Sequence, residues 1–463
     1  MISLVLLILL TGACQNFAYE NKVYGSDPFS FPLTVKDFTL KYGQGPVFGK
    51  IVVGTPLVIS TLLENNFSIQ TNAYYIMQVL DKSHFTISIQ SKSVDISNLA
   101  PTELTSTWTP DVPGVYTIEA FVWSMDDNSP VIMSPKNSII VNIKPVPDVK
   151  TYTLCMVGCD YSDFQKAIDH LHKPENKILV KDGNYELYGP VRVWSHTRIE
   201  FSSNAKITYL GAENTAIFRA NNTTNIEIVN AQITASTSNL GIKAFSFTSS
   251  SRINITGGEI SLNKGRDSAG IYCRDCTNVE ITGISIANAS RLIDVGSSSG
   301  ANDGKSSKIW ILNGKYESSS IEGIKINYSD KVYILGNNVT DTNNNAIDIG
   351  YSSHTLVSGN RIRNGGIPHG SGIHTDSAIG ADIYRNEVNG TGEAGITVYR
   401  ASEINIMNNT ITNTGSSGIA IIATEEPSSN IRVKHNDVRN SVGSWIYVSP
   451  NQEKIVVSDN MTD

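Results

Sequence analysis

A repeated pattern in the C-terminal half of the chain constrains its fold more than any other feature. Asparagine, then any residue, then valine or isoleucine recurs five times, starting at Asn337, Asn360, Asn386, Asn409 and Asn436. The successive spacings are 23, 26, 23 and 27 residues. A second column, a small residue followed by isoleucine, keeps the same period at Ile324, Ile347, Ile373, Ile396 and Ile419. Two columns that advance together predict a solenoid in which each repeat adds one layer.

Short strands suit these repeats better than helices do, because Gly, Ser, Thr and Asn are abundant and long helical patterns are nearly absent. The inward valine and isoleucine side chains would stack into one core, with strands of successive coils about 4.8 Å apart. We interpret the asparagine column as a buried turn ladder, whose amides satisfy turn backbone groups and each other. These asparagines are therefore structural, and the predicted fold class is all-β.

Residues 160–185 resemble the opening of a known family of solenoids. A helical stripe is formed by Phe164, Ala167, Ile168 and Leu171. A buried strand at 178–180 follows and ends at a turn at Gly183. This order resembles the capping helix and first strand of right-handed parallel β-helix proteins of the pectate-lyase-like superfamily. The resemblance implies a right-handed parallel β-helix over residues 151–463, closed at its N-terminal end by a capping helix.

The N-terminal part predicts a different architecture. Residues 33–144 contain short alternating strands separated by turn residues. The run at 111–116, Asp-Val-Pro-Gly-Val-Tyr, resembles the tyrosine corner of immunoglobulin-like sandwiches. The resemblance implies an immunoglobulin-like β-sandwich at 20–144, joined by a proline-rich linker at 145–150. Trp108 and Trp123 would either bind sugars from this sandwich or belong to its core.

The first residues predict export. Residues 2–13 form an apolar run that is too short to span a bilayer comfortably, and it is typical of the core of a signal peptide at 1–19. Leu-Thr-Gly-Ala-Cys at 10–14 is close to a lipoprotein cleavage box, so a lipid anchor at Cys14 is the alternative to cleavage near Ala18. No later stretch is apolar enough to cross a membrane. The expected location is therefore secreted or cell-surface associated.

Cysteine usage and charge narrow the class further. Apart from Cys14, the cysteines form two near pairs, Cys155 with Cys159 and Cys273 with Cys276. An exported protein favours disulfides for all four, with a zinc site as the alternative. The charged fraction is 17% and the net charge is −7. A nucleic-acid partner is not expected, because it would require a basic surface.

The second column fixes which side chains face outward. With the isoleucines pointing inward, alternation turns the next residue of each strand out. These outward positions are Lys325, Asp348, His374, Thr397 and Ala420. Two residues further along, they are Asn327, Gly350, Asp376, Tyr399 and Ile422. Lower coils add Tyr272, Arg274 and Asp294. We therefore expect His374 to stack above Asp348 and Asp348 above Lys325. Asp376 is expected beneath Tyr399.

Such a wall resembles the grooves of polysaccharide lyases and mannuronan C5-epimerases in fold and in the kinds of residue presented. Both reactions begin with removal of the C5 proton of a uronate, whose carboxylate must be neutralised. The resemblance implies that His374 is the base. Tyr399 or Tyr351 would return a proton or act as the base. Asp348 and Asp376 would orient His374 or bind a calcium ion that clamps the substrate acid.

Further residues are assigned to substrate binding. Cations that would neutralise the carboxylate are Lys325, Arg274 and Arg400. Residues 364–370 bring His369 to the rim of the wall, and His354 follows Tyr351 around the coil. Asn327 is the last residue assigned to substrate binding. Strict alternation would turn Arg400 inward, and the long turn at 296–307 would wall the groove. The expected partner is a polysaccharide or cell-surface glycan.

Three alternatives stay open at the level of sequence. The Tyr-Gly-x-Asp-Pro-His motif of the epimerases is not found, so the assignment depends on residue type and face. A glycoside hydrolase would use Asp348 and Asp376 as its two carboxylates. A non-catalytic adhesin or envelope protein would use the same wall to bind glycans. In the third alternative the wall has no function. Its polar residues are then an ordinary outward face, with Lys325 and Asp348 as a cross-strand pair.

Overall fold

The structure is a computed structural model that describes ten stretches of the chain. They are residues 31–42, 45–46, 51–65, 72–95, 102–126, 129–145, 149–235, 241–297, 306–423 and 426–462. The chain divides into two compact units, residues 1–43 with 50–146, and residues 44–49 with 147–463. The predicted signal segment, Cys14 and residues 146–148 of the predicted linker lie outside the described residues.

The first unit contains two β-sheets within the described residues. In one, β1 (Leu33–Tyr42), β4 (Leu57–Asn65) and β7 (Thr102–Trp108) are antiparallel neighbours in that order. The other has the order β3-β10-β8-β5-β6, with β9 beside β8. Its strands are β3 (Ile51–Val52), β5 (Asn72–Leu80), β6 (Thr86–Asp95), β8 (Gly114–Asp126), β9 (Ser129–Ile132) and β10 (Asn137–Lys144). The short β2 (Gly45–Pro46) belongs to the segment 44–49.

A tyrosine ties a loop of the first unit to the following strand, as its sequence predicts. The hydroxyl of Tyr116 donates a hydrogen bond to the carbonyl oxygen of Val112 at 2.9 Å. Trp108 packs edge-on against Tyr116 with ring centroids 5.1 Å apart, and it is only 7% exposed. Trp108 is therefore a core residue, whereas Trp123 is half-buried against Phe121. The immunoglobulin-like assignment of this unit stays a prediction.

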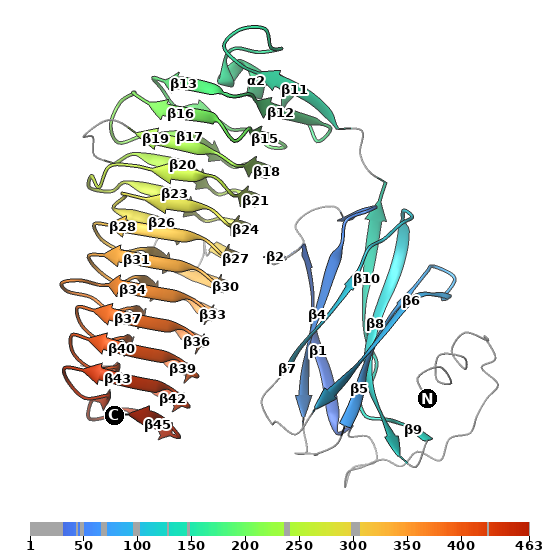
Figure 1. Ribbon diagram of the computed structural model, residues 1–463, viewed down its shortest axis with the longest axis vertical. Helices are drawn as coiled ribbons and strands as arrows, with labels where there is room; N and C mark the ends of the chain where they lie inside the picture. Colours follow the sequence, from blue (N-terminus) through green and yellow to red (C-terminus); the bar gives the residue numbers. More distant parts are fainter. Residues whose placement is uncertain are drawn as a thin grey trace. The chain divides into compact units, whose positions relative to one another are not determined.

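The second unit is a parallel β-solenoid of about 11 turns, with three sheets that run along its axis (Figure 1). The 13-stranded sheet of the described residues consists of β11 (Lys150–Leu154), β12 (Asn176–Val180), β15 (Arg198–Phe201), β18 (Thr224–Val229), β21 (Ser251–Thr256), β24 (Thr277–Thr282), β27 (Ser306–Leu312), β30 (Ser329–Leu335), β33 (Ser353–Ser358), β36 (Ile379–Tyr384), β39 (Ser402–Met407), β42 (Ser429–Lys434) and β45 (Glu453–Ser458).

The two other sheets complete each coil. The 12-stranded sheet of the described residues consists of β13 (Gly183–Leu187), β16 (Ala205–Tyr209), β19 (Gln232–Ala235), β22 (Glu259–Ser261), β25 (Ser285–Ala287), β28 (Lys315–Ser319), β31 (Asn338–Thr342), β34 (Arg361–Gly365), β37 (Glu387–Thr391), β40 (Thr410–Thr414), β43 (Asp437–Ser441) and β46 (Met461–Thr462). The 11-stranded sheet in the same part of the chain consists of β14 (Val191–Arg192), β17 (Ala216–Asn221), β20 (Lys243–Thr248), β23 (Ala269–Arg274), β26 (Arg291–Gly296), β29 (Ile324–Asn327), β32 (Ile347–Gly350), β35 (Ile373–Asp376), β38 (Ile396–Tyr399), β41 (Ile419–Ile422) and β44 (Ile446–Val448).

Both sequence columns have the structural roles predicted for them. The isoleucines of the second column pair in register from coil to coil and are fully buried. The asparagines form a ladder at the turn between the 13-stranded and 12-stranded sheets, where the Nδ2 atom of each donates to Oδ1 of the next at 2.9–3.0 Å. Asn460 extends this ladder by one step beyond the five predicted members.

The predicted helical stripe forms a helix. α2 (Phe164–Leu171) begins after Asp163, whose side chain accepts a hydrogen bond from the amide of Lys166 at 2.8 Å. All four residues of the predicted stripe are buried. Figure 1 shows α2 beside the first strands of the solenoid. Its assignment as a cap stays a prediction. No helix within the described residues is long and apolar enough to cross a membrane.

The cysteines follow the prediction only in part. Cys155 and Cys159 form a disulfide. Cys273 and Cys276 are free thiols, so the predicted disulfide between them is wrong. The physical reason is their setting in the solenoid core, where both are fully buried. The Cys276 thiol lies near two backbone carbonyl oxygens, those of Phe247 and Arg274. Burial also raises the pKa of the Cys273 thiol well above its ordinary value.

Candidate functional site

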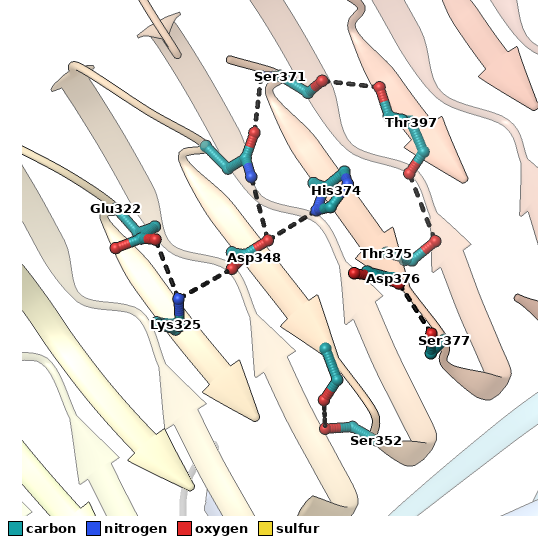
Figure 2. Close-up of polar contacts among 12 residues, drawn as sticks. Glu322, Lys325, Asp348, Ser352, Ser371, His374, Thr375, Asp376, Ser377 and Thr397 are labelled. Carbon is teal, nitrogen blue, oxygen red and sulfur yellow. Dashed lines mark hydrogen bonds and ion pairs between the residues drawn. The ribbon is translucent and has the colours of Figure 1, made fainter. Parts of the chain in front are cut away.

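The wall of polar residues lies on the outer face of the 11-stranded sheet. Lys325 of β29 is opposite Asp348 of β32, which is opposite His374 of β35. One coil further on, Thr397 of β38 follows His374 and Tyr399 follows Asp376. This is the register that the sequence predicts. Figure 2 shows Lys325, Asp348 and His374 from three successive coils directed toward one another.

Asp348 and His374 form a hydrogen-bonded dyad at the centre of this wall. His374 Nδ1 lies 2.7 Å from Oδ1 of Asp348 (Figure 2). The Asp348 and His374 side chains are 14% and 22% exposed. Asn345 also donates to Asp348 Oδ1 at 3.0 Å, and Lys325 Nζ lies 3.5 Å from Oδ2. The carboxylate is thus held from three sides, in a position that is largely shielded from solvent.

The protonation of the dyad follows from these contacts. Burial alone would raise the pKa of Asp348, but the His374 hydrogen bond and the charges of His374 and Lys325 outweigh it and lower the pKa. An ionised carboxylate only accepts hydrogen bonds, so Nδ1 of His374 carries the proton and donates it to Asp348. Within the described residues no hydrogen bond reaches Nε2 of His374. In its neutral form, with the proton on Nδ1, His374 presents Nε2 as a base.

A chain of ion pairs continues from the dyad down the wall. Lys325 Nζ lies 3.0 Å from Glu322, and Arg291 Nε lies 2.7 Å from the other oxygen of Glu322. Arg291 is also 3.7 Å from Asp294, which binds Arg274 at 2.8 Å. Lys325 is therefore shared between two acids, and its charge balances the dyad.

Sequence reasoning missed Glu322 and Arg291, because both precede the alternating part of their strands. A signal was nevertheless present in the sequence. The residue directly before the small-residue–isoleucine pair forms a third column, which reads Glu322, Asn345, Ser371, Ala394 and Ser417. Arg291 occupies the same position one coil below Glu322. Three of these residues contact one another or the wall, because Glu322 pairs with Lys325, and Asn345 bonds to Asp348 and to the amide of Ser371.

A second group of side chains lies two residues further along the same strands. Arg400 NH2 donates to both carboxylate oxygens of Asp376, at 2.9 and 3.2 Å. The guanidinium of Arg400 lies over the Tyr399 ring, 4.7 Å from its centroid. Strict alternation would turn Arg400 inward, but its φ of 48° ends the strand with a left-handed turn and directs it outward. Asn327 covers Gly350, where an added Cβ would lie 2.4 Å from Asn327 Oδ1.

The remaining predicted site residues lie further from the dyad. His354 belongs to the 13-stranded sheet and pairs with Asp330 at 2.7 Å. His369 is exposed on the loop between β34 and β35. Arg274 is on β23, two coils below Lys325, where it covers Tyr272 and binds Asp294. Tyr351 follows β32 at the turn toward the 13-stranded sheet. Residues 298–305 of the predicted long turn lie outside the described residues.

The two wall aspartates do not fit a calcium site. Calcium takes six to eight oxygen ligands. Asp348 is surrounded by His374, Lys325 and Asn345, all of which are nitrogen donors. Asp376 is paired with Arg400. Within the described residues, no three His, Cys, Asp or Glu side chains gather in a way that would hold a metal ion.

Comparison with known proteins supports the fold. A family model described as a right-handed β-helix region matches residues 303–461, so the solenoid is a right-handed β-helix. No curated protein matches the sequence. The structure of PfbA, a surface adhesin of Streptococcus pneumoniae, is similar with a TM-score of 0.51 at 14% identity, covering 64% of this chain and 86% of that chain.

Two further solved structures resemble this chain more distantly. The A-module of mannuronan C-5 epimerase AlgE4 of Azotobacter vinelandii has a TM-score of 0.40 at 12% identity, covering 68% of this chain and 94% of that chain. Tailspike protein 3 of bacteriophage CBA120 has a TM-score of 0.43 at 11% identity, covering 65% and 57%. At such identities the likeness concerns the β-helix fold alone. These TM-scores and identities do not bear on function, which has to be argued from the site.

Proposed function

We propose that this protein is an exported carbohydrate-active enzyme that removes the C5 proton of a uronate residue in a linear polysaccharide, as a lyase or a C5-epimerase. One observation carries the proposal. A histidine on an exposed sheet face is bonded through Nδ1 to a shielded, ionised aspartate and presents Nε2 outward. This is the arrangement of a general base whose tautomer is fixed by its partner.

The neighbouring side chains supply the other groups that this reaction needs. As His374 Nε2 takes the C5 proton, negative charge develops on the uronate carboxylate and has to be stabilised. The positive charges of the wall, Lys325 beside Asp348 and Arg400 on the coil after His374, supply this stabilisation. The Tyr399 hydroxyl would protonate the departing glycosidic oxygen in a lyase. In an epimerase it would return a proton to C5 from the opposite face.

Lys325 and Asp348 support His374, the proposed base, through their charges. Lys325 is held between Glu322 and Asp348, so its charge helps to keep Asp348 ionised. Asp348 in turn stabilises the imidazolium that His374 becomes after proton transfer. The proposal therefore assigns Lys325 to positioning as well as to stabilising the uronate carboxylate.

The ion pairs of the wall disfavour the hydrolase alternative. A glycoside hydrolase needs one carboxyl group that stays protonated as general acid. The pKa of Asp348 is lowered by its partners, and Asp376 is bound to an arginine. Neither carboxyl group suits that role. A glycan-binding protein without catalysis remains the second candidate, since the solenoid offers a long straight face for a linear polymer.

Product analysis tests the proposed function. The protein is incubated with alginate and with pectate, and ultraviolet absorbance, uronate stereochemistry and reducing ends are followed. A lyase gives new absorbance from an unsaturated end, and an epimerase changes C5 configuration without cleavage. His374→Ala should abolish either change. Reducing ends alone would indicate a hydrolase, and no change with any polymer would favour a binding protein.

His354→Ala is a matched control for this experiment. His354 also binds an aspartate through Nδ1 at 2.7 Å, but on the 13-stranded sheet and 71% exposed. Its loss should leave turnover unchanged, because it does not belong to the wall. Equal loss of turnover in both variants would point to a general structural effect and contradict the assignment of His374.

The same proposal places the mature protein outside the cytoplasm, because its predicted signal segment and polysaccharide partner belong there. The N-terminal unit is proposed to be an immunoglobulin-like module, which the hydrogen bond between Tyr116 and Val112 supports. Helix α2 is proposed to cap the solenoid, since its buried Phe164 packs against Phe201 and Phe218 of the first coils. Expression with the first 19 residues fused to a reporter enzyme would test export.

A further inference from the structure

A column of left-handed residues follows the strands of the wall. Tyr328, Tyr351, Ser377 and Arg400 come directly after β29, β32, β35 and β38, with φ values of 47°, 48°, 53° and 48°. The amides of the first three donate to carbonyl oxygens of the coil above at 2.8–3.0 Å. The four positions are therefore equivalent, one coil apart from each other.

The first two members of this column are stacked tyrosines. The Tyr328 and Tyr351 rings have centroids 4.8 Å apart and an interplanar angle of 9°. This separation equals the spacing of the coils, about 4.8 Å. Two rings lying edge to edge in one plane would collide at that distance, so their faces point along the solenoid axis. One face of Tyr351 therefore points toward the next coil, and the residue is 42% exposed.

The next position in the column holds Ser377 instead of a third ring. No third ring of this column therefore covers the upper face of Tyr351, and we call the position above this face, beside Ser377, the slot. Ser377 bonds to Asp376 Oδ1 at 2.8 Å, as Figure 2 shows. Arg400 stands one coil higher and is held by Asp376. Its Nε is buried and has no hydrogen-bond partner among the described residues. The slot thus has the aromatic face of Tyr351 below it and, one coil higher, the guanidinium of Arg400, which lies over Tyr399 and is held by Asp376.

We propose that this slot binds one acidic sugar residue of a polysaccharide, with the sugar ring on the Tyr351 face and the sugar carboxylate on Arg400. The aromatic face suits the apolar C–H groups of a sugar ring, and the guanidinium pairs with a carboxylate through charge-assisted hydrogen bonds. A neutral sugar would satisfy only the first of these contacts. The slot therefore selects a uronate.

The position of the slot relates it to the proposed catalytic dyad, so this inference rests on the proposed function. Ser377 lies three residues after His374 on the same coil, about 10 Å along the strand. A polymer that places one residue in the slot has its neighbouring residues near His374. The slot acts as a positioning subsite that holds the chain while the adjacent residue reacts.

Filling the slot tests the inference. Ser377→Tyr places a third ring in the column at a φ that tyrosine already adopts at Tyr328 and Tyr351. Binding is measured by calorimetry with hexamers of mannuronate, guluronate and galacturonate, and with their carboxyl-reduced counterparts. All variants carry His374→Ala to prevent turnover during the measurement. We expect the parent to bind one uronate hexamer at least tenfold more tightly than its reduced counterpart.

In this background Ser377→Tyr should weaken binding at least tenfold, and Tyr351→Ala by about tenfold. Arg400→Gln should remove the preference for the carboxylated hexamer. Asn408→Tyr is the matched control, because it adds the same side chain at an exposed left-handed turn, φ 56°, between the 13-stranded and 12-stranded sheets. Its affinity should stay within about twofold of the parent. Thermal unfolding checks that each variant folds.

Unchanged affinity in Ser377→Tyr and Tyr351→Ala, equal binding of reduced hexamers, or no binding of any hexamer would overturn the slot. Its failure is distinguishable from failure of the proposed function. If turnover depends on His374 but Ser377→Tyr binds the hexamers with normal affinity, the slot is disproved and the proposed function is not. If hexamer binding depends on the slot residues but the unmodified protein shows no turnover, the proposed enzymatic function is disproved and the slot is not.

Discussion

At the scale of single residues, Asp348 determines what His374 can do. Its carboxylate accepts hydrogen bonds from His374 and Asn345 and forms an ion pair with Lys325. These contacts keep Asp348 ionised in a shielded position. The ring of His374 is therefore fixed with Nδ1 toward the carboxylate. A histidine on the same face without this partner would rotate and present either nitrogen.

Asp348→Asn tests this fixation. An amide can donate to Nδ1 as well as accept from it, so the wrong tautomer of His374 becomes populated. We expect kcat to fall about 10²- to 10⁴-fold with little change in KM, because an orienting partner acts on the base rather than on substrate binding. Steady-state kinetics on the polymer that the wild type turns over provides the measurement. Asp330→Asn, which alters the aspartate beside His354, is the control, and equal loss in both variants would contradict the assignment.

Glu280 carries a pH dependence that is separate from the wall. This side chain on β24 is 8% exposed, and burial raises its pKa to about 7 despite a hydrogen bond from Thr282. An unfolded chain would have a glutamate pKa of about 4.3. Between these values the folded state binds more protons than the unfolded state, so the free energy of unfolding falls as pH rises from about 4.3 to about 7.

Glu280→Gln should remove this dependence, which amounts to about 4 kcal/mol across that interval. Urea unfolding of the wild type and the variant at about pH 4 and about pH 8, which lie on either side of the interval, would measure it. The difference in unfolding free energy between the two proteins should shift with pH in favour of the variant at high pH. A pH-independent difference would show that Glu280 is not protonated in the folded state.

The sequence was sufficient for part of the site, and the reason is physical. Strand alternation has a period of two, so the buried isoleucines fix Lys325, Asp348 and His374 on one outer face. Alternation says nothing about residues that precede a strand or end it. Glu322 was therefore missed, and Arg400 was placed only once its left-handed turn was known.

At the scale of elements, side-chain ladders hold the coils in register. The Asn386 side chain accepts from the amide and Nδ2 of Asn360, and it donates to Val357 O and to Asn409 Oδ1. It is 1% exposed, so water cannot replace these partners. The repeating asparagine in the sequence indicates this ladder, because few other side chains both donate and accept in a turn.

Asn386→Ala should therefore destabilise the protein by about 3 kcal/mol, since it leaves buried backbone groups unsatisfied. Asn413→Ala is the matched control, because Asn413 bonds to Asn389 of the coil below at an exposed position of β40. Its cost should be about 0.5 kcal/mol or less. Chemical denaturation gives both values, and equal costs would contradict the ladder as a source of stability.

The second sequence column also has a packing cause. A Cβ at Gly372 would lie 2.5 Å from Val388 and 2.7 Å from the carbonyl oxygen of Gly395 in the next coil. Even a Cβ does not fit between the coils there without a shift, which explains why the pair begins with glycine at this position. The sequence could not settle the state of Cys273 and Cys276, because near pairs of cysteines do not reveal whether core packing or a disulfide determines their place.

At the scale of the whole molecule, the net charge of −7 opposes binding of the proposed substrate, which is a polyanion. A polyanion would be repelled by an acidic protein unless cations gather locally. The β-helix brings Arg274, Lys325 and Arg400 to one wall from distant parts of the chain, where each is paired with an acid, so the wall carries its positive charges as ion pairs rather than as an excess. The fold therefore contributes to function by register, and function cannot be inferred from composition alone.

The central claim is that the His374–Asp348 dyad removes the C5 proton of a uronate. Loss of the C5 proton signal in nuclear magnetic resonance spectra, recorded with polyuronates in heavy water, tests it most directly. The account predicts that the wild type and His354→Ala lose this signal at equal rates, while His374→Ala retains it. Retention of the signal by the wild type with every polyuronate, or its loss with His374→Ala at the wild-type rate, would contradict the claim.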